Sequence, residues 1–239
     1  MQPHLTPFDG VLLVDKPPRL TSHDVVDRVR RHFGFKKVGH CGTLDPAATG
    51  LLVLVLERAT KLQHHLMADD KTYEGTMLLG VTTDSQDADG EVIAEKPVPP
   101  LTTDDIERAF AKFRGDIQQV PPMVSALKHK GQPLYKLARK GKTVEREPRL
   151  IHIYDLRLLR FDLPRLRFRV SCTKGTYVRT LCHDIGEALG CGAHLAELRR
   201  LRQGRFDLND ARSLDELLTL SRTQLQPLII PILKLGKPA

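Results

Sequence analysis

A single carboxylate stands inside a stretch of small and turn-forming residues near the start of the chain. Residues 39–50 read GHCGTLDPAATG, and Asp45 has no other Asp or Glu within ten positions on either side. Three glycines, a proline and two threonines disfavour both helix and strand, which predicts a loop before the apolar run at 51–56. Loops on a rigid scaffold often carry reactive groups. The stretch therefore predicts a displayed carboxylate; an Asp-Pro pair that only caps a helix or starts a turn is the alternative.

The charge of the chain favours a polyanionic partner. Its formal net charge is +8, with a pI near 9.4. The basic residues gather in three segments, at 28–37, 128–149 and 199–205. Such clusters are the electrostatic footprint of nucleic-acid binding, provided that the fold brings them to one groove. An ordinary solvated surface is the alternative.

Composition argues against metal, disulfide and membrane chemistry. The four cysteines form no Cys-x-x-Cys pair, so we expect reduced thiols, with Cys41 packed as a small residue or, alternatively, acting as a nucleophile. Residues 84–90 carry three acids and a glycine, but position 96 is Lys rather than the Glu of a calcium loop. The chain has no apolar run long enough to span a bilayer and no signal-peptide pattern. We therefore expect a cytoplasmic protein with neither metal nor membrane partner.

The elements that position the acid follow from hydrophobic periodicity. An apolar content of 41% in 239 residues suits one large domain or two small ones. The pattern predicts an α/β (α+β) fold, with a central, mainly antiparallel sheet flanked by helices. Expected strands lie at 10–14, 51–56, 71–80, 150–161 and 165–172, the last two as a hairpin. Expected helices lie at 25–33, at 104–113 (capped by Thr103), after 174–180 with Leu181, Ile185 and Leu189 on one face, and at 214–220. A plain strand-to-helix turn with Thr176 as the cap is the alternative for residues 175–176. Residues 120–142, rich in proline, glycine and positive charge, predict an insertion outside the core with one short helix near 134–139.

Several strings resemble one enzyme family. Residues 39–50 resemble the catalytic loop of the tRNA pseudouridine synthase B family and of its relative in the box H/ACA particle. The segment VDKPPRLTSHDVV at 14–26 and the segment SCTKGTYVRT at 171–180 resemble two further motifs of the same family. The resemblance runs from about residue 10 to about residue 220. The family pattern has Gly two residues after the first proline, where this chain has Arg19.

The resemblance implies the pseudouridine synthase fold, with a catalytic domain at 1–220 and a basic thumb loop inserted at about 121–149. The tail at 221–239 is too short for the PUA-type RNA-binding domain that many members carry. The implied activity isomerises uridine 55 in the T loop of tRNA. The C1′–N1 bond breaks, the uracil rotates, and C5 joins C1′, a sequence that needs no cofactor and no metal.

The resemblance also implies the site. Asp45 is the essential carboxylate, and whether it adds to C1′, adds to C6 or takes a proton from the sugar stays open. Arg179 pairs with Asp45 and keeps it ionised. Tyr73 stacks on the uracil, and Tyr177 and Leu198 form the other walls of the pocket. By ordinary burial preference, a tyrosine in the first turn of a helix and a leucine in an apolar helix are more often plain core residues.

Two further residues complete the implied set. His40 fills the space that the flipped nucleotide leaves. Lys16 lies beside the floor of the site, with a solvated turn lysine as the alternative. The expected partner is the T-arm of tRNA, bound by a monomer. Two other functions stay open: a guide-dependent synthase of the H/ACA type, and a non-catalytic tRNA-binding or tRNA-folding protein.

Overall fold

The chain divides into two compact units joined by two strands. The computed structural model describes residues 5–125, 127–129, 131–138 and 140–235. Unit 1 comprises residues 1–73 and 199–239, and unit 2 comprises residues 74–198. Strands β4 (Lys71–Leu79) and β12 (Ala193–Gln203) each begin in one unit and end in the other. Across the described ranges, no helix is both long enough and apolar enough to cross a bilayer.

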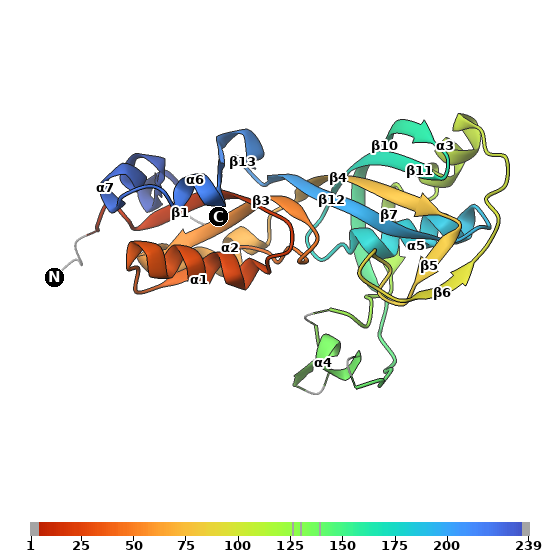
Figure 1. Ribbon diagram of the computed structural model, residues 1–239, viewed down its shortest axis with the longest axis horizontal. Helices are drawn as coiled ribbons and strands as arrows, with labels where there is room; N and C mark the ends of the chain where they lie inside the picture. Colours follow the sequence, from red (N-terminus) through yellow and green to blue (C-terminus); the bar gives the residue numbers. More distant parts are fainter. Residues whose placement is uncertain (1–4, 126, 130, 139, 236–239) are drawn as a thin grey trace. The chain divides into compact units, whose positions relative to one another are not determined.

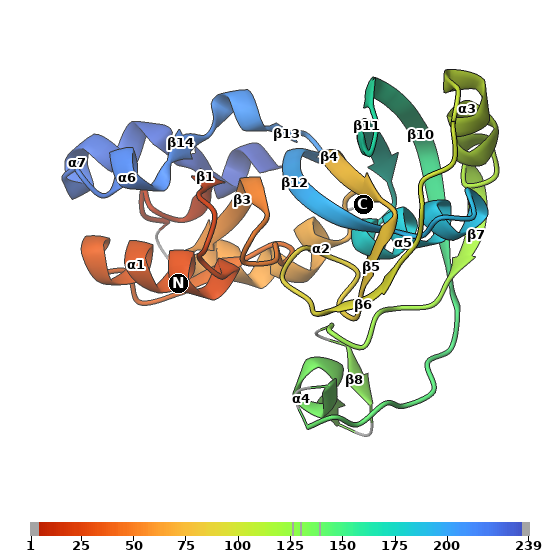
Figure 2. The same ribbon diagram turned by 45° about the vertical axis from the view of Figure 1, so that its right-hand side comes forward.

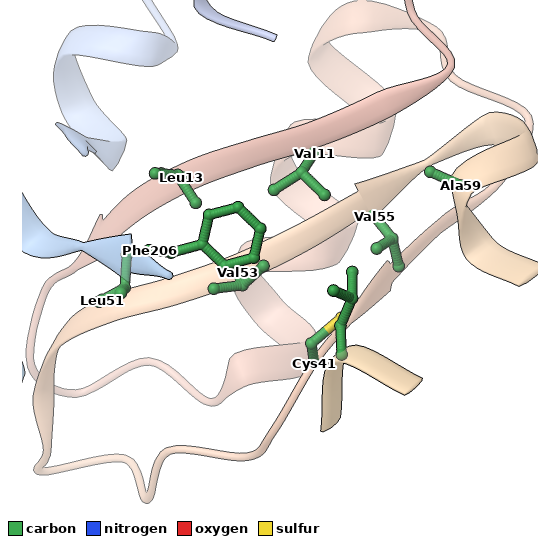
Figure 3. Packing of buried hydrophobic residues seen from close by; sticks show 9 residues of the cluster. Val11, Leu13, Cys41, Leu51, Val53, Val55, Ala59 and Phe206 are labelled. Atoms are coloured by element: carbon green, nitrogen blue, oxygen red, sulfur yellow. The ribbon is translucent and has the colours of Figure 1, made fainter. Parts of the chain in front are cut away.

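Unit 1 is built on two long antiparallel strands, β1 (Gly10–Lys16) and β3 (Thr49–Leu56). The end of β12 pairs parallel with β3, and β14 (Arg212–Ser213) pairs parallel with β1. Three short strands complete the sheet: β2 (Val38–His40), β13 (Phe206–Asp207) and β15 (Ile230–Pro231). Alternate apolar residues of β1 and β3 pack with Phe206 and Cys41 in one core, which Figure 3 shows from close by. The next residues along β3 are buried as well, so both faces of this strand are covered.

The helices of unit 1 begin at residues suited to capping. Helix α1 (Ser22–Phe33) starts at a capping box between Thr21 and Asp24, three residues earlier than the apolar pattern alone predicts, and runs along the sheet (Figure 1). After β3 come the 3₁₀ turn η1 (Glu57–Leu62) and helix α2 (Gln63–Met67). The C-terminal segment adds short helical elements: η2 (Leu208–Asp210), α6 (Leu214–Leu217), α7 (Arg222–Leu225), η3 (Gln226–Leu228) and η4 (Ile232–Leu235).

Unit 2 contains the predicted hairpin. Strands β10 (Arg149–Asp162) and β11 (Arg165–Cys172) are antiparallel, and the sheet order is β12, β4, β11, β10 and β7 (Gly115–Gln119). A separate pair is formed by β5 (Val81–Thr83) and β6 (Val92–Glu95). Helices α3 (Thr103–Ala111) and α5 (Val178–Ala188) accompany this sheet. A mixed, mainly antiparallel sheet flanked by helices confirms the predicted fold class.

The predicted insertion is a peripheral part of unit 2. Its described residues include β8 (Lys128–His129), β9 (Gln132–Pro133) and α4 (Leu134–Ala138). In both ribbon views this segment stands away from the sheet of its own unit (Figures 1 and 2). Its role as a thumb over RNA, and the predicted catalytic domain at 1–220, stay predictions.

Three local predictions are wrong. Thr102, not Thr103, caps α3, because its side chain accepts the Asp105 N–H in a capping box. Tyr177, not Thr176, is the N-cap residue of α5; the Thr176 hydroxyl instead donates to the carbonyl of Thr173. Leu198 lies in strand β12, not in a helix. The reason is that Gly190 and Gly192 adopt φ values of 83° and 72°, which end the helical path and turn the chain into the strand.

Candidate active site

The Asp45 loop is pinned to helix α1 on the side that precedes the acid. The hydroxyl of Ser22 donates to the Leu44 carbonyl (3.1 Å) and accepts the Leu44 N–H (2.8 Å), and both contacts are buried. Asp45 itself is half-buried, and its carbonyl accepts the Ala48 N–H at 3.1 Å. The predicted loop is shorter than expected, because residues 39–40 belong to β2 and residues 49–50 to β3. The acid is therefore held between two ordered strands.

Lys16 is a buried cation of this loop rather than a solvated turn lysine. Its side chain is fully buried, and Nζ donates to the carbonyls of Pro17 (2.9 Å) and Pro46 (3.1 Å). Burial lowers the pKa of the Lys16 amine to about 8; the negative charges of Asp45 and Asp24 act in the opposite direction. Lys16 therefore contributes a positive charge next to Asp45 at neutral pH.

Arg19 holds a backbone conformation that glycine favours. Its φ is 67°, in the turn that follows Pro17 and Pro18. A left-handed conformation costs a residue with a Cβ roughly 1–2 kcal/mol. The strain accompanies a specific contact, since the Arg19 N–H donates to the carbonyl of Pro46 at 2.8 Å. The departure from the family pattern therefore falls at a position with a structural preference for Gly.

Two buried polar side chains of β12 donate hydrogen bonds to backbone carbonyls of the loop and of β3. Arg200 is 1% exposed and donates through Nε to the Leu51 carbonyl (2.7 Å) and through a terminal nitrogen to the Gly42 carbonyl (3.1 Å). Gln203, also buried, donates to the carbonyl of Cys41. Sequence reasoning counted Arg200 among surface cations and missed this role, because nothing in the local pattern marks which arginine of a basic run points inward.

The close pairing of β3 with β12 requires Gly50. Its φ is 96°, and a Cβ at this position would lie 2.3 Å from the Arg200 carbonyl oxygen. Next to this contact, Arg199 makes a two-pronged ion pair with Asp15, at 3.1 and 2.7 Å. Backbone packing and charge pairing thus attach the end of β12 to the loop and to β1.

His40 and Cys41 precede the acid; His40 is half-buried and Cys41 is fully buried. Burial, followed by the nearby charge of Arg200, lowers the pKa of His40, so its imidazole favours the neutral form. Burial raises the pKa of the Cys41 thiol to about 12. Because the thiolate is the reactive form, this environment argues against Cys41 as a nucleophile and supports its packing role.

In unit 2, Arg179 is a buried guanidinium in the first turn of α5. One terminal nitrogen contacts Asp87 Oδ2 at 3.1 Å, and the other donates to the Val124 carbonyl at 2.7 Å. The exposed fractions of the two side chains are 7% for Arg179 and 16% for Asp87. Arg179 thus has a carboxylate partner that the sequence did not indicate; its predicted pairing with Asp45 stays a prediction.

The polar turn at 84–90 is a support for this arginine. The Asp87 carbonyl accepts a hydrogen bond from Thr83 (2.6 Å), and the Asp87 carboxylate accepts one from Ser85 (2.5 Å). Asp87 also forms a parallel bridge with Leu195. The sequence predicts a polar turn at 84–90 and no calcium site, but no local pattern indicates that Asp87 pairs with Arg179.

The residues expected to bind the base differ in how far they are buried. Tyr73 is 8% exposed in β4, whereas Tyr177 and Leu198 are half-buried. Gln119, which no sequence pattern marks, makes two hydrogen bonds to the backbone of Tyr177: its amide donates to the Tyr177 carbonyl (3.1 Å) and its oxygen accepts the Tyr177 N–H (2.8 Å). The backbone of Tyr177 is therefore fixed at the start of α5.

The predicted residues fall into two groups. Unit 1 brings Lys16 and the Asp45 loop together across thirty positions of sequence and carries His40 and Tyr73 as well. Unit 2 carries Tyr177, Arg179 and Leu198. That both groups serve one site stays a prediction. In the part of the chain that the structure describes, no three His, Cys, Asp or Glu side chains gather as metal ligands would.

Comparisons with known proteins agree with this reading. Residues 30–178 match the N-terminal domain of TruB family pseudouridylate synthases, and residues 179–234 match a tRNA pseudouridylate synthase B C-terminal domain. A tRNA pseudouridine synthase B from Opitutus terrae is 56% identical over 94% of this chain and 93% of its own length. A protein of the same name from Chromohalobacter salexigens is 49% identical over 95% and 74% of the two chains.

Solved structures give the same fold. The crystal structure of a Cbf5-Nop10-Gar1 complex contains a chain with a TM-score of 0.75 and 31% identity; the match covers 95% of this chain and 61% of that one. An H/ACA RNP bound to a substrate RNA containing 2′-deoxyuridine gives a TM-score of 0.67 at 31% identity, over 89% of this chain and 53% of that one. With both family domains matched and a full-length relative at 56% identity, the chain belongs to the TruB family of pseudouridylate synthases.

Proposed function

We propose that this protein is a tRNA pseudouridine synthase that isomerises uridine 55 in the T loop, with Asp45 as the essential carboxylate. The observation that carries the proposal is the built environment of Asp45: a loop fixed by Ser22, with the buried cation Lys16 beside it. The relatives named tRNA pseudouridine synthase B support tRNA as the substrate. The reaction is a balanced isomerisation, since C1′–N1 breaks, C1′–C5 forms, and the hydrogen on C5 exchanges with water while N1 gains one.

Each site residue has a proposed role in the reaction. Asp45 acts on the sugar or the base, and the cations Lys16 and Arg179 favour its ionised form. Tyr73, Tyr177 and Leu198 hold the extruded uracil, and His40 fills the vacated position in the RNA. Extrusion costs roughly a few kcal/mol of lost stacking, which contacts with the RNA backbone offset. We also propose that the protein acts in the cytoplasm, as a monomer, without metal or cofactor.

The direct test measures tritium release from C5-labelled uridine in an unmodified tRNA transcript. We expect release by the wild-type protein, loss of it in Asp45→Asn, and unchanged release in the control Asp210→Asn, which alters an exposed acid of the same unit. A transcript with cytidine at position 55 should release no label from labelled uridines elsewhere. Undiminished release by Asp45→Asn would remove the proposed role of the carboxylate.

A guide-dependent activity is the second candidate, favoured by the structural similarity to the Cbf5 complex. It predicts no isomerisation of free tRNA unless a guide RNA and its proteins are added. A non-catalytic tRNA binder instead predicts tight tRNA binding with no tritium release by the wild-type protein. Release from tRNA alone therefore separates the proposed function from both alternatives.

A further inference from the structure

Arg19 is an exposed arginine at a turn position that favours glycine. The turn places Pro18 before a residue with positive φ, an arrangement in which Gly or Asn is the favoured second residue. Arginine adopts this conformation only at an energetic cost, and residues with strained backbone cluster at active sites, ligand clamps and switch regions. The strained conformation of Arg19 therefore indicates a functional role for its side chain.

The position of Arg19 relative to the acid is fixed by two hydrogen bonds. The Pro46 carbonyl accepts both the Arg19 N–H, at 2.8 Å, and the Lys16 ammonium, at 3.1 Å. Pro46 directly follows Asp45 in the chain. The main chain of Arg19 is thus attached to the acid's own loop, and all of these residues belong to unit 1.

The guanidinium of Arg19 is available to a ligand. Arg19 is exposed, and among the residues described here no hydrogen bond or ion pair engages its side chain. By contrast, Arg199 and Arg200 near the same loop are occupied by Asp15 and by backbone carbonyls. An exposed arginine presents a planar fork of donors that suits the oxygen atoms of a phosphate.

We propose that Arg19 is a substrate-binding residue whose guanidinium contacts a backbone phosphate of the RNA strand next to the nucleotide that meets Asp45. The inference rests on the proposed function, because a nucleotide held at Asp45 brings its own flanking phosphates to this loop. Such a contact positions the strand without reading its sequence. The strained turn then serves to carry a cation to the edge of the site.

The test measures tRNA binding by filter retention between 50 and 200 mM salt, together with tritium-release kinetics. Arg19→Asn removes the charge with a side chain that tolerates positive φ, Arg19→Lys keeps the charge, and Lys61→Gln removes an exposed charge from η1 as a control. Losing one phosphate contact should make affinity less sensitive to salt. Between 50 and 200 mM salt, the fold decrease in affinity of the variant should be about one third of the wild-type fold decrease. We expect Arg19→Asn to show this change and a raised KM with unchanged kcat.

The controls separate binding from folding. Arg19→Asn should unfold at the wild-type temperature or above it, since the substitution relieves strain, and Arg19→Lys should restore the salt dependence. Equal salt dependence and equal KM in wild type and Arg19→Asn would overturn the inference while leaving the proposed function intact. If wild type releases no tritium, the proposed function fails, and the binding measurement still decides whether Arg19 contacts RNA.

Discussion

The ammonium of Lys16 donates a hydrogen bond to the carbonyl of Pro46, the residue that follows Asp45, at 3.1 Å. Lys16 ends strand β1, so this contact ties the acid's loop to the central strand pair of unit 1. It also places a buried positive charge where the negative charge of Asp45 acts on it. The loop thereby gains position and electrostatic support from one side chain.

The first prediction concerns the alkaline limb of the pH profile. The pKa of Lys16 is lowered from 10.5 to about 8, so the amine loses its charge at a lower pH in the folded protein than in the unfolded chain. Its contribution to the free energy of unfolding therefore rises between pH 8 and 10.5, because the unfolded state binds more protons there. Activity should change in the opposite direction, as the cation beside Asp45 disappears.

The measurement is kcat/KM for tritium release between pH 6.5 and 9.5, on wild type and Lys16→Gln. We expect the wild-type value to decline above a pH of about 8. Lys16→Gln should be about 10-fold less active at pH 7, equivalent to ~1.4 kcal/mol, and flatter at alkaline pH. An equally steep alkaline decline in Lys16→Gln would assign that limb to another group.

The second prediction tests the support of Arg179. Asp87→Asn removes the carboxylate charge that faces a buried guanidinium, and breaking such a pair costs about 3 kcal/mol or more. We expect lower thermal stability of unit 2 and slower tritium release at saturating tRNA, with the neighbouring exposed Asp89→Asn as the control. If Asp87→Asn matches the control in both measurements, Asp87 does not position Arg179.

The third prediction concerns the close approach at Gly50. Gly50→Ala would place a Cβ 2.3 Å from a backbone oxygen that has little freedom to move, and we expect a loss of about 3 kcal/mol or more in the free energy of unfolding. Gly34→Ala is a matched control, because its φ is also positive (66°) but its nearest neighbouring atom lies 3.9 Å away. Urea denaturation of both variants should show a loss of only about 1 kcal/mol for Gly34→Ala. Equal losses would mean that conformation alone, not contact, requires glycine at Gly50.

The fourth prediction addresses the thiol next to the site. Because the pKa of Cys41 is raised to about 12 and its side chain is buried, iodoacetamide at pH 8 should label it slowly in the folded protein and rapidly after denaturation. Cys41→Ala should retain most of the tritium-release activity, with a modest loss of stability from the vacated volume. Rapid labelling of the folded protein, accompanied by loss of activity, would restore Cys41 as a reactive group.

Periodicity and turn chemistry predicted most of the elements. The apolar run at 51–56 is the core of β3, the 150–172 segment is the expected hairpin, and the chain belongs to the family that its motifs resemble. The errors fell where local signals compete. Two adjacent threonines left the cap of α3 ambiguous, and the apolar residues around Leu198 fit a helix as well as a strand until pairing with neighbouring strands decides.

The lone acid in a loop before a buried strand is predictable from the residues alone, because glycine, proline and apolar periodicity are local properties of the chain. Which charged side chains turn inward depends instead on long-range contacts: Lys16 and Arg200 are buried, and Arg179 is paired with Asp87, whereas Arg19 stays exposed. These outcomes depend on carbonyls and carboxylates supplied from 30 to more than 100 positions away, such as Pro46 for Lys16 and Leu51 for Arg200. No local pattern records such a partner, since a cation is buried only where the fold brings acceptors to it.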